Sequence, residues 1–583
     1  MILQALYDYY QRKSANADSA LAPAGFEYKE IPFILEITAD GKLAQIADTR
    51  TGDGKKKRAK SERVPQGVKK TSGVAANLLW DNAEYVLGID TKGKPERVKE
   101  QQAAFAERIR QLAIAEQDEG IAAVLAFLEN LDTEVLQQQP QWEEIAVTNP
   151  NLTFRLQGQL HLVCQSRKVQ AALMSAGGDE NSKATCLLTG EQAEIERLHP
   201  SIKGVWGAQS SGANIISFNL DAFTSYGKSQ SFNAPVSKEA AFAYTTALNH
   251  LLSKDSTQRM QVGDASTVFW AEQEHPLVDD FTALWGAADN NKDDPDRNTK
   301  AVKALYKAVQ EYGRNPALGE TTRFFILGLA PNAARISIRF WHVGTVREVS
   351  QRIVDHFDYL KIDRSERDVE FLPLWLLLRS TALLGKTENV PPNLAGDVIR
   401  CILEGLPYPQ TLLASAVRRI RAEQEITYPR AALIKAYLNR LNPTENLAVS
   451  LDLENSNTGY RLGRLFAVLE KIQEEAQPGI NATIRDRYYG AASATPVTVF
   501  STLLKLKNHH LSKLDNKGRV SNFEKLLGEI MGGIVDFPAH LPLADQGRFA
   551  IGYYHQRQDF FKKHTKTETT QPESETGAQG ELL

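Results

Sequence analysis

Cysteine is scarce in this chain, since its 583 residues include only Cys164, Cys186 and Cys401 and no CxxC pair. Disulfide scaffolds and zinc ribbons need closely spaced cysteines, so both classes are excluded. Long apolar runs are missing too. The densest, Phe371–Leu378, ends at Arg379, whereas a membrane-spanning helix needs about 18 apolar residues. The first residues also lack the basic start and apolar core of a signal peptide. These absences predict a cytoplasmic protein with no membrane partner.

Common catalytic motifs are absent as well, including HExxH, GxSxG and the His-Asp doublet of metal-dependent nucleases. Gly227-Lys228-Ser229 resembles the end of a phosphate-binding loop, but the first glycine is missing and Pro235 precedes the next expected helix. A phosphate-binding loop must run directly into a helix whose N-terminus faces the phosphates. We therefore expect no catalytic residue, metal or cofactor. The alternative is a nucleic-acid-dependent nuclease or ATPase that uses this loop.

Hydrophobic spacing predicts an α+β fold, because residues 1–360 mix both periodicities whereas the chain after Phe371 is almost purely helical. The expected strands lie at 30–37, 43–46, 152–163, 214–220, 324–329 and 335–340, and the expected helices at 95–116, 237–253 and 346–360. Four later amphipathic helices, around 462–472, 500–514, 523–534 and 548–563, predict an antiparallel bundle. The expected domains are a mixed region at 1–360, a helical connector at 361–450, the bundle at 451–564 and a disordered tail at 565–583.

The net charge is only −3, from 68 basic and 71 acidic residues, yet one segment is strongly basic. Between residues 54 and 70 there are eight lysines and arginines against Glu62 alone, a local charge of +7. Crowded like charges repel unless a polyanion neutralises them, and nucleic acid does so with release of counterions. The cations that we assign to DNA are Lys55, Lys56, Lys57, Arg58, Lys69 and Lys70. A solvated loop is the alternative interpretation.

Amide and hydroxyl side chains suited to base edges accompany these cations. In the same region they are Gln66, Thr71, Ser72 and Asn77. A second polar segment, Arg197–Asn214, mixes glycines with short polar side chains and offers Gln209, Ser210, Ser211 and Asn214. Lys228 can contact a phosphate of the same polymer. The alternative for the second segment is an ordinary Gly/Ser turn.

Several stretches together resemble the large subunit of the type I-C CRISPR Cascade surveillance complex. They are Met1–Tyr10, Val64–Gly73, Ala76–Asn82, Leu198–Val205, Gly207–Gly212, Leu329–Arg335 and Gly552–Gln558. The resemblance extends to about residue 564 and so covers nearly the whole chain.

This resemblance implies a non-catalytic subunit of a ribonucleoprotein in which guide RNA reads sequence by base pairing and protein reads a short adjacent DNA motif. It implies that the subunit helps to open the duplex and presents a surface for a helicase-nuclease. The implied partners are double-stranded DNA, the displaced single strand, guide RNA, the backbone and RNA-handle-binding Cascade subunits, and the small subunit. The residues implied as motif readers are Gln66, Lys69, Lys70, Thr71, Ser72 and Asn77, with Gln209, Ser210, Ser211 and Asn214 as a second set.

Overall fold

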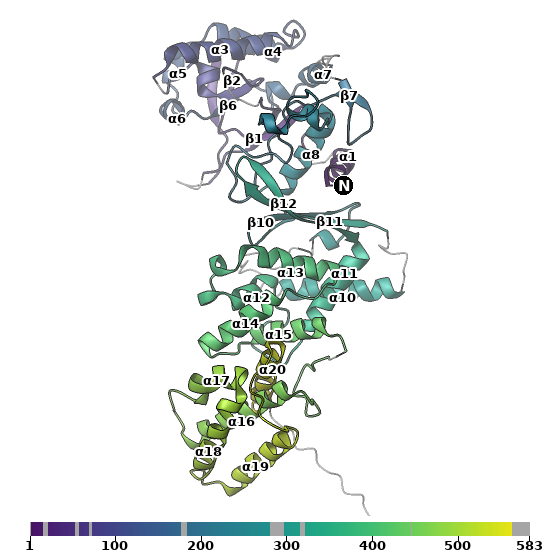
Figure 1. Cartoon of the computed structure of the whole chain (residues 1–583). Helices are drawn as coiled ribbons and strands as arrows, with labels where there is room; N and C mark the ends of the chain where they lie inside the picture. Colours follow the sequence, from purple (N-terminus) through teal and green to yellow (C-terminus); the bar gives the residue numbers. More distant parts are fainter. Residues whose placement is uncertain are drawn as a thin grey trace, which may run out of the picture. The chain divides into compact units, whose positions relative to one another are not determined.

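The computed structural model describes residues 2–15, 21–52, 57–68, 73–91, 93–175, 183–279, 281, 297–314, 321–444 and 446–562. The chain forms two compact units (Figure 1). Unit 1 comprises Met1–Val278 with Thr322–Val343, and unit 2 comprises Asp279–Thr321 with Gly344–Leu583. Strands occur in unit 1 and helices fill the described part of unit 2, which confirms the α+β class. The expected domain limits at residues 360 and 450 stay predictions, and the expected disordered tail lies outside the described residues.

Unit 1 contains two four-stranded sheets and two short ribbons. The strands are β1 (Phe26–Glu30), β2 (Phe33–Ile37), β3 (Leu43–Asp48), β4 (Ser61–Pro65), β5 (Trp80–Asn82), β6 (Asn151–Leu156), β7 (Lys183–Thr185), β8 (Gln192–Glu194), β9 (Arg259–Val262), β10 (Ala265–Ala271), β11 (Arg323–Asn332) and β12 (Arg335–Thr345). The sheet orders are β3-β2-β6-β5 and β12-β11-β10-β9, and β1 pairs with β4 as β7 does with β8. The predicted hairpin at 30–46 is confirmed as β2 and β3, and β11 and β12 confirm the strands predicted after residue 324.

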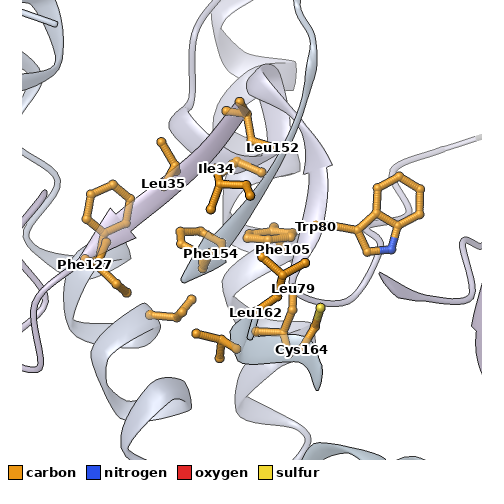
Figure 2. Packing of buried hydrophobic residues seen from close by; sticks show 14 of the residues in the cluster. Ile34, Leu35, Leu79, Trp80, Phe105, Phe127, Leu152, Phe154, Leu162 and Cys164 are labelled. Carbon is orange, nitrogen blue, oxygen red and sulfur yellow. The ribbon is translucent and has the colours of Figure 1, made fainter. Parts of the chain in front are cut away.

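The helices of unit 1 cover these sheets. They are α1 (Ile2–Ser14), α2 (Ala83–Leu87), α3 (Pro95–Arg110), α4 (Glu119–Glu129), α5 (Thr133–Gln137), α6 (Trp142–Thr148), α7 (Arg167–Ser175) and α8 (Lys238–Leu251). Phe154 of β6 lies beside Phe105 of α3 and Phe127 of α4, with ring centroids 6.3 and 5.8 Å apart (Figure 2). Helices α1 and α8 share a second core with β10 and β11 (Figure 1).

Two expected strand regions of unit 1 differ from the structure. Strands were expected over 152–163 on both sides of Gly158; the first is confirmed as β6, whereas the second is wrong, because Val163–Gln165 form a 3-10 turn. No strand forms over 214–220, where Asn214 makes a single bridge to Arg335. The physical reason is the side chain of Asn214, whose Nδ2 donates to the carbonyl oxygens of His199 and Pro200, 3.0 Å away in each case. This residue therefore closes a loop rather than extending a strand.

The described part of unit 2 is helical. Its α-helices are α10 (Arg297–Arg314), α11 (Val346–Leu360), α12 (Leu374–Thr381), α13 (Pro392–Glu404), α14 (Gln410–Glu423), α15 (Tyr428–Leu441), α16 (Thr458–Ala476), α17 (Ile484–Ala494), α18 (Phe500–Leu511), α19 (Lys517–Gly532) and α20 (Leu543–Asp559). The four predicted bundle helices are confirmed as α16, α18, α19 and α20, whereas α17 was not predicted. None of the described helices in either unit is long and apolar enough to cross a membrane.

The expected antiparallel arrangement holds for α16 and α19 but is wrong for α16 and α20. Near the start of α16, Arg464 bonds Glu529 near the end of α19, and near the end of α16, Glu475 bonds Arg519 near the start of α19. Helices α16 and α19 therefore run in opposite directions. By contrast Asn457 bonds Asp545 and Glu474 bonds Arg557, so α16 and α20 run parallel.

Two glycines allow this parallel pair to pack backbone against backbone. A Cβ added at Gly463 of α16 would overlap the carbonyl oxygen of Phe549, and one added at Gly552 of α20 would overlap that of Tyr460. The opposite side of α20 packs on α14 and α15, where Gly547 faces Leu413 and Ile434. Helix α20 therefore packs both on helices of the expected connector and on α16 of the expected bundle, most extensively on α16.

Because a methyl group cannot fit at the crossing, we expect Gly463→Ala or Gly552→Ala to lower the free energy of unfolding by about 1–3 kcal/mol. The matched control is Gly528→Ala in α19, where nothing lies within 4 Å of an added Cβ. There alanine should stabilise by about 0.5–1 kcal/mol, because glycine is the poorer helix former. Urea denaturation followed by circular dichroism measures both changes. Equal effects at the three positions would contradict the close crossing.

Two buried histidines make the stability of unit 2 depend on pH. Burial, with Arg440 nearby, lowers the pKa of His356 to about 3, and burial, with Lys435 nearby, lowers the pKa of His555 to about 3. Each ring bonds a tyrosine hydroxyl through Nδ1, that of Tyr408 for His356 and that of Tyr460 for His555. The folded state therefore holds both rings neutral.

We expect the free energy of unfolding to be highest above about pH 6.5, the usual pKa of an unfolded histidine, and to fall as the pH drops toward 3. Between pH 7 and pH 5 the loss should be about 2 kcal/mol for each ring, because the unfolded chain takes up protons that the folded chain refuses. Denaturation curves at the two pH values measure this loss. The variant His356→Gln/His555→Gln should flatten the dependence, whereas His509→Gln at an exposed position should keep it.

Candidate nucleic-acid interface

The basic segment begins beside a single antiparallel backbone bridge in unit 1. Thr51 and Arg58 exchange both backbone hydrogen bonds, with N···O distances of 3.0 and 2.9 Å. Thr51 follows the end of β3, and Arg58 precedes the start of β4. Lys57 and Arg58 are exposed, whereas Lys55 and Lys56 lie outside the described residues. The two described cations beside this bridge thus lie at the surface.

Acidic neighbours partly neutralise the described cations. Arg58 lies 3.4 Å from a carboxylate oxygen of Asp255 and 3.8 Å from one of Glu30. Lys60 pairs with Glu62 on the adjoining strand at 2.7 Å. Exposed pairs of this kind contribute only about 0–1 kcal/mol each. Another anion can therefore replace these carboxylates at little cost.

The strand that follows, β4, carries the next candidates. It pairs antiparallel with β1 from Glu30 opposite Ser61 to Phe26 opposite Pro65. The backbone N–H of Gln66 donates to the carbonyl oxygen of Gly25, 2.8 Å away, so the ribbon continues one residue beyond β4. The side chain of Gln66 is half-buried. Lys69, Lys70, Thr71 and Ser72, which follow it, lie outside the described residues.

The side chain of Asn77 is buried and hydrogen-bonded to a neighbouring turn rather than exposed to solvent. It is 6% exposed, and its Oδ1 accepts from the N–H of Val68 at 2.9 Å. Its own N–H donates to Asp81 at 2.9 Å. The indole N–H of Trp80 donates to the carbonyl oxygen of Pro65 at 2.7 Å, which ties the same turn to β5. In the described conformation Asn77 therefore holds Val68 in place, and its amide is not displayed to solvent.

The second segment is a loop closed at its base. Ile202 and Ala213 form an antiparallel bridge, and Asn249 of α8 both donates to the carbonyl of Ser201 and accepts from the N–H of Lys203, at 3.1 and 2.7 Å. Asn214, expected as a DNA contact, is 6% exposed and serves this closure. At the tip of the loop, Gln209, Ser210 and Ser211 are exposed. The loop therefore presents the three side chains for which a base-edge role was expected.

A single carboxylate joins the two segments. Glu27 of β1 accepts from the N–H of Gly67 at 3.2 Å through Oε1 and pairs with Lys203 at 3.7 Å through Oε2. Lys29, two residues along β1, lies over the ring of Trp80 at 5.4 Å. Burial, with Lys203 nearby, lowers the pKa of Lys29. The structure thus brings together two segments that are more than 100 residues apart in the sequence.

Lys228 lies in a separate tight turn. Its N–H donates to the carbonyl of Ser225 at 3.0 Å, and Asn233 closes the turn by accepting from Ser225 N–H and donating to Lys228 O, both at 2.9 Å. A 3-10 turn, Gln230–Asn233, follows, and α8 starts only at Lys238. No helix N-terminus therefore follows Gly227-Lys228-Ser229 directly. Within the described ranges, no three side chains of His, Cys, Asp or Glu gather as a metal site requires.

Glu27 and Asn249 were not predicted as parts of the site. Neither lies in a polar or basic cluster of the sequence, since Glu27 sits in an alternating strand and Asn249 in an apolar helix. The only available signal was that each is a polar residue on an element with an apolar face. Their importance comes from the tertiary fold, which places them between loops that a local pattern treats separately.

Comparison with known families gives one result that spans the chain. The family described as CRISPR-associated protein (Cas_Csd1) matches residues 6–561, which is nearly the full length. No curated protein matches the chain significantly.

Because Glu27 anchors both segments, we expect Glu27→Ala to free the turn at Gly67 and the loop at Lys203 together. Amide hydrogen exchange at 64–68 and 201–213 should become faster in this variant. Glu27→Gln keeps an acceptor for Gly67 but loses the charge, so it should affect mainly the loop at Lys203. The control is Glu62→Ala, which removes the partner of Lys60 and should leave both segments protected. Unchanged exchange in Glu27→Ala would contradict the shared anchor.

Proposed function

The chain belongs to the Cas_Csd1 family of CRISPR-associated proteins, and from this premise we propose that it is the large, non-catalytic subunit of a type I-C Cascade surveillance complex. In this role it recognises the protospacer-adjacent motif in double-stranded DNA, assists opening of the duplex and presents a surface for the helicase-nuclease. Guide RNA, the backbone and RNA-handle-binding subunits and the small subunit are its further proposed partners, in the cytoplasm.

The observation that carries this proposal is the shared anchor at Glu27. It joins the turn at Gly67, which leads into the basic residues Lys69 and Lys70, to the loop that exposes Gln209, Ser210 and Ser211. Cations supply affinity for any phosphate backbone, whereas amides and hydroxyls distinguish base edges. One surface that combines both kinds of group is what recognition of a short DNA motif requires.

The burial of Asn77 and Asn214 divides the proposed roles. Asn77 positions the turn at Val68, and Asn214 positions the loop whose tip is at Ser210. We therefore assign base contacts to the exposed Gln209, Ser210 and Ser211 with Thr71 and Ser72. Lys55, Lys56, Lys57, Arg58, Lys69, Lys70 and Lys228 are assigned to the phosphate backbone. Gln66, half-buried beside Gly67, stays among the proposed motif readers.

The alternative, a nuclease or ATPase that uses Gly227-Lys228-Ser229, has less support. The turn closes on itself through Asn233, and its backbone leads into a 3-10 turn rather than an α-helix. Magnesium-dependent ATP hydrolysis or DNA cleavage by the pure protein, lost in Lys228→Ala, would favour this alternative.

Removing two phosphate contacts should weaken DNA binding whatever the sequence. In the assembled complex we expect Lys69→Ala/Lys70→Ala to lower affinity for duplexes with and without the motif, and to reduce the slope of log K against log salt by about 2. Gln209→Ala with Ser210→Ala should instead lower mainly the preference for the motif, by about 1–3 kcal/mol. Titrations of both duplexes at several salt concentrations measure the two effects.

Lys307→Ala/Lys386→Ala is the matched control, since it removes two exposed positive charges from unit 2. It should change neither the salt slope nor the motif preference. Equal behaviour of all three variants and the wild type would contradict the proposed interface.

A further inference from the structure

Strand β12 forms an open edge of its sheet in unit 1. The strand order β12-β11-β10-β9 places it at the end, next to β11 on one side only. On the other side the described residues contribute a single bridge, in which Asn214 lies parallel to Arg335 and accepts a hydrogen bond from the N–H of Ile336 at 3.0 Å. Of the 11 residues of β12 only Ile336 is buried, so the edge beyond the bridge is accessible to a further strand.

The bridge also shows which backbone groups the edge presents. Backbone N–H and C=O groups along a strand point alternately to its two edges, and the N–H of Ile336 points away from β11. The same groups of Ile338 and Phe340 therefore point outward as well. Ile338 is 43% exposed and Phe340 is half-buried. Both residues thus offer a donor and an acceptor at the spacing of an extended chain.

Contacts on both faces of the sheet hold this edge in place. A Cβ added at Gly328 of β11 would overlap the ring of Phe340, so this glycine makes room for the ring on one face. On the other face Trp341 stacks on a phenylalanine of β11, with ring centroids 5.7 Å apart. Arg339 bonds Asp264 through Nε and Nη2, at 3.1 and 2.7 Å. An incoming strand therefore meets an ordered edge, which lowers the entropic cost of binding.

We propose that β12 binds an extended segment of a partner protein as an additional strand along Ile338–Phe340, and that apolar and acidic residues alternate in this segment. Main-chain hydrogen bonds to a sheet edge supply affinity in this mode of recognition, and alternate side chains supply specificity. Residues opposite Ile338 and Phe340 lie beside apolar side chains, whereas the residue between them lies beside Arg339. This proposal goes beyond the proposed function, because it requires no nucleic acid.

Charge favours an acidic segment of another protein over a second copy of β12. The strand itself contains no aspartate or glutamate, and the side chain of Arg339 is 43% exposed beside its partner Asp264. A carboxylate on the incoming strand can therefore reach Arg339. In two antiparallel copies with Ile338 of one opposite Phe340 of the other, Arg339 would lie opposite itself. Like charges directly opposite each other destabilise a strand pair, whereas unlike charges stabilise it.

The test uses the purified full-length chain and a fluorescein-labelled heptapeptide of sequence TVEVEVT. We expect saturable binding, measured by fluorescence anisotropy, and binding of TVKVKVT that is weaker by about two- to fivefold. N-methylation of the valines, whose N–H groups face β12 when the glutamates lie beside Arg339, should weaken binding by about tenfold or more. N-methylation of the glutamates, whose N–H groups point away from β12, should leave binding unchanged.

Two variants of the chain test the same edge. Arg339→Glu should reverse the preference, so that TVKVKVT binds about two- to fivefold more tightly than TVEVEVT. Ile338→Pro removes an outward donor and should weaken both peptides about fivefold or more, while an edge position whose N–H does not pair with β11 tolerates proline. Circular dichroism should therefore show an unchanged fold. Lys307→Glu, an exposed charge reversal in unit 2, is the matched control and should keep the wild-type preference.

The proposal is overturned if N-methylation of valines and of glutamates weakens binding equally, or if Arg339→Glu leaves the preference as in the wild type. It is also overturned if sedimentation shows a dimer of the chain that Ile338→Pro abolishes, which would assign the edge to a second copy. If Ile338→Pro does not fold, the reversal in Arg339→Glu decides. Duplex titrations with Lys69→Ala/Lys70→Ala test the DNA surface separately, so either proposal can fail without the other.

Discussion

The contacts of the Glu27 carboxylate are the interactions on which the arrangement of the two candidate segments in unit 1 depends. The carboxylate accepts a hydrogen bond from the turn at Gly67 and pairs with Lys203. The two partners come from segments with separate cores behind them, one around β2 and β6 and the other around α8 and β10. Glu27 therefore links a segment of one core to a segment of the other, and the ion pair of Arg58 with Asp255 makes a second link.

The local charge of the surface is consequently lower than the sequence of residues 54–70 indicates. Arg58 and Lys60 already have carboxylate partners when no other ligand is present. Such pairs exchange readily with phosphate, because exposed ion pairs are weak and each released counterion adds to the entropy of binding. A surface of paired cations remains compact and avoids self-repulsion, yet it still offers its positive groups to a polyanion. This reconciles a nearly neutral chain with the proposed role in binding DNA.

Periodic patterns predicted much of the fold. The helix at 346–360 and the strands after residue 324 are confirmed as α11, β11 and β12, because buried faces at helical or alternating spacing leave a clear record in the sequence. The strand at 214–220 failed because the Asn214 side chain bonds two distant carbonyl groups, an interaction that no local pattern contains. The direction of α20 failed for a similar reason. Short loops favour antiparallel neighbours, but glycines at 463 and 552 allow a closer, parallel contact between helices that are distant in sequence.

At the candidate site, residue type alone does not indicate which side chains are available to contact a ligand. Asparagine suits a base edge and suits a pair of backbone groups equally well, since its amide both donates and accepts. Sequence therefore could not distinguish Asn77 and Asn214, which are buried and hold loops, from Gln209, Ser210 and Ser211, which are exposed at a loop tip. Burial makes the distinction, because an amide already bonded to its own backbone has less capacity left for a ligand. The buried amides fix the geometry of the loops, and this fixed geometry is what the proposed discrimination between base pairs by the exposed side chains requires.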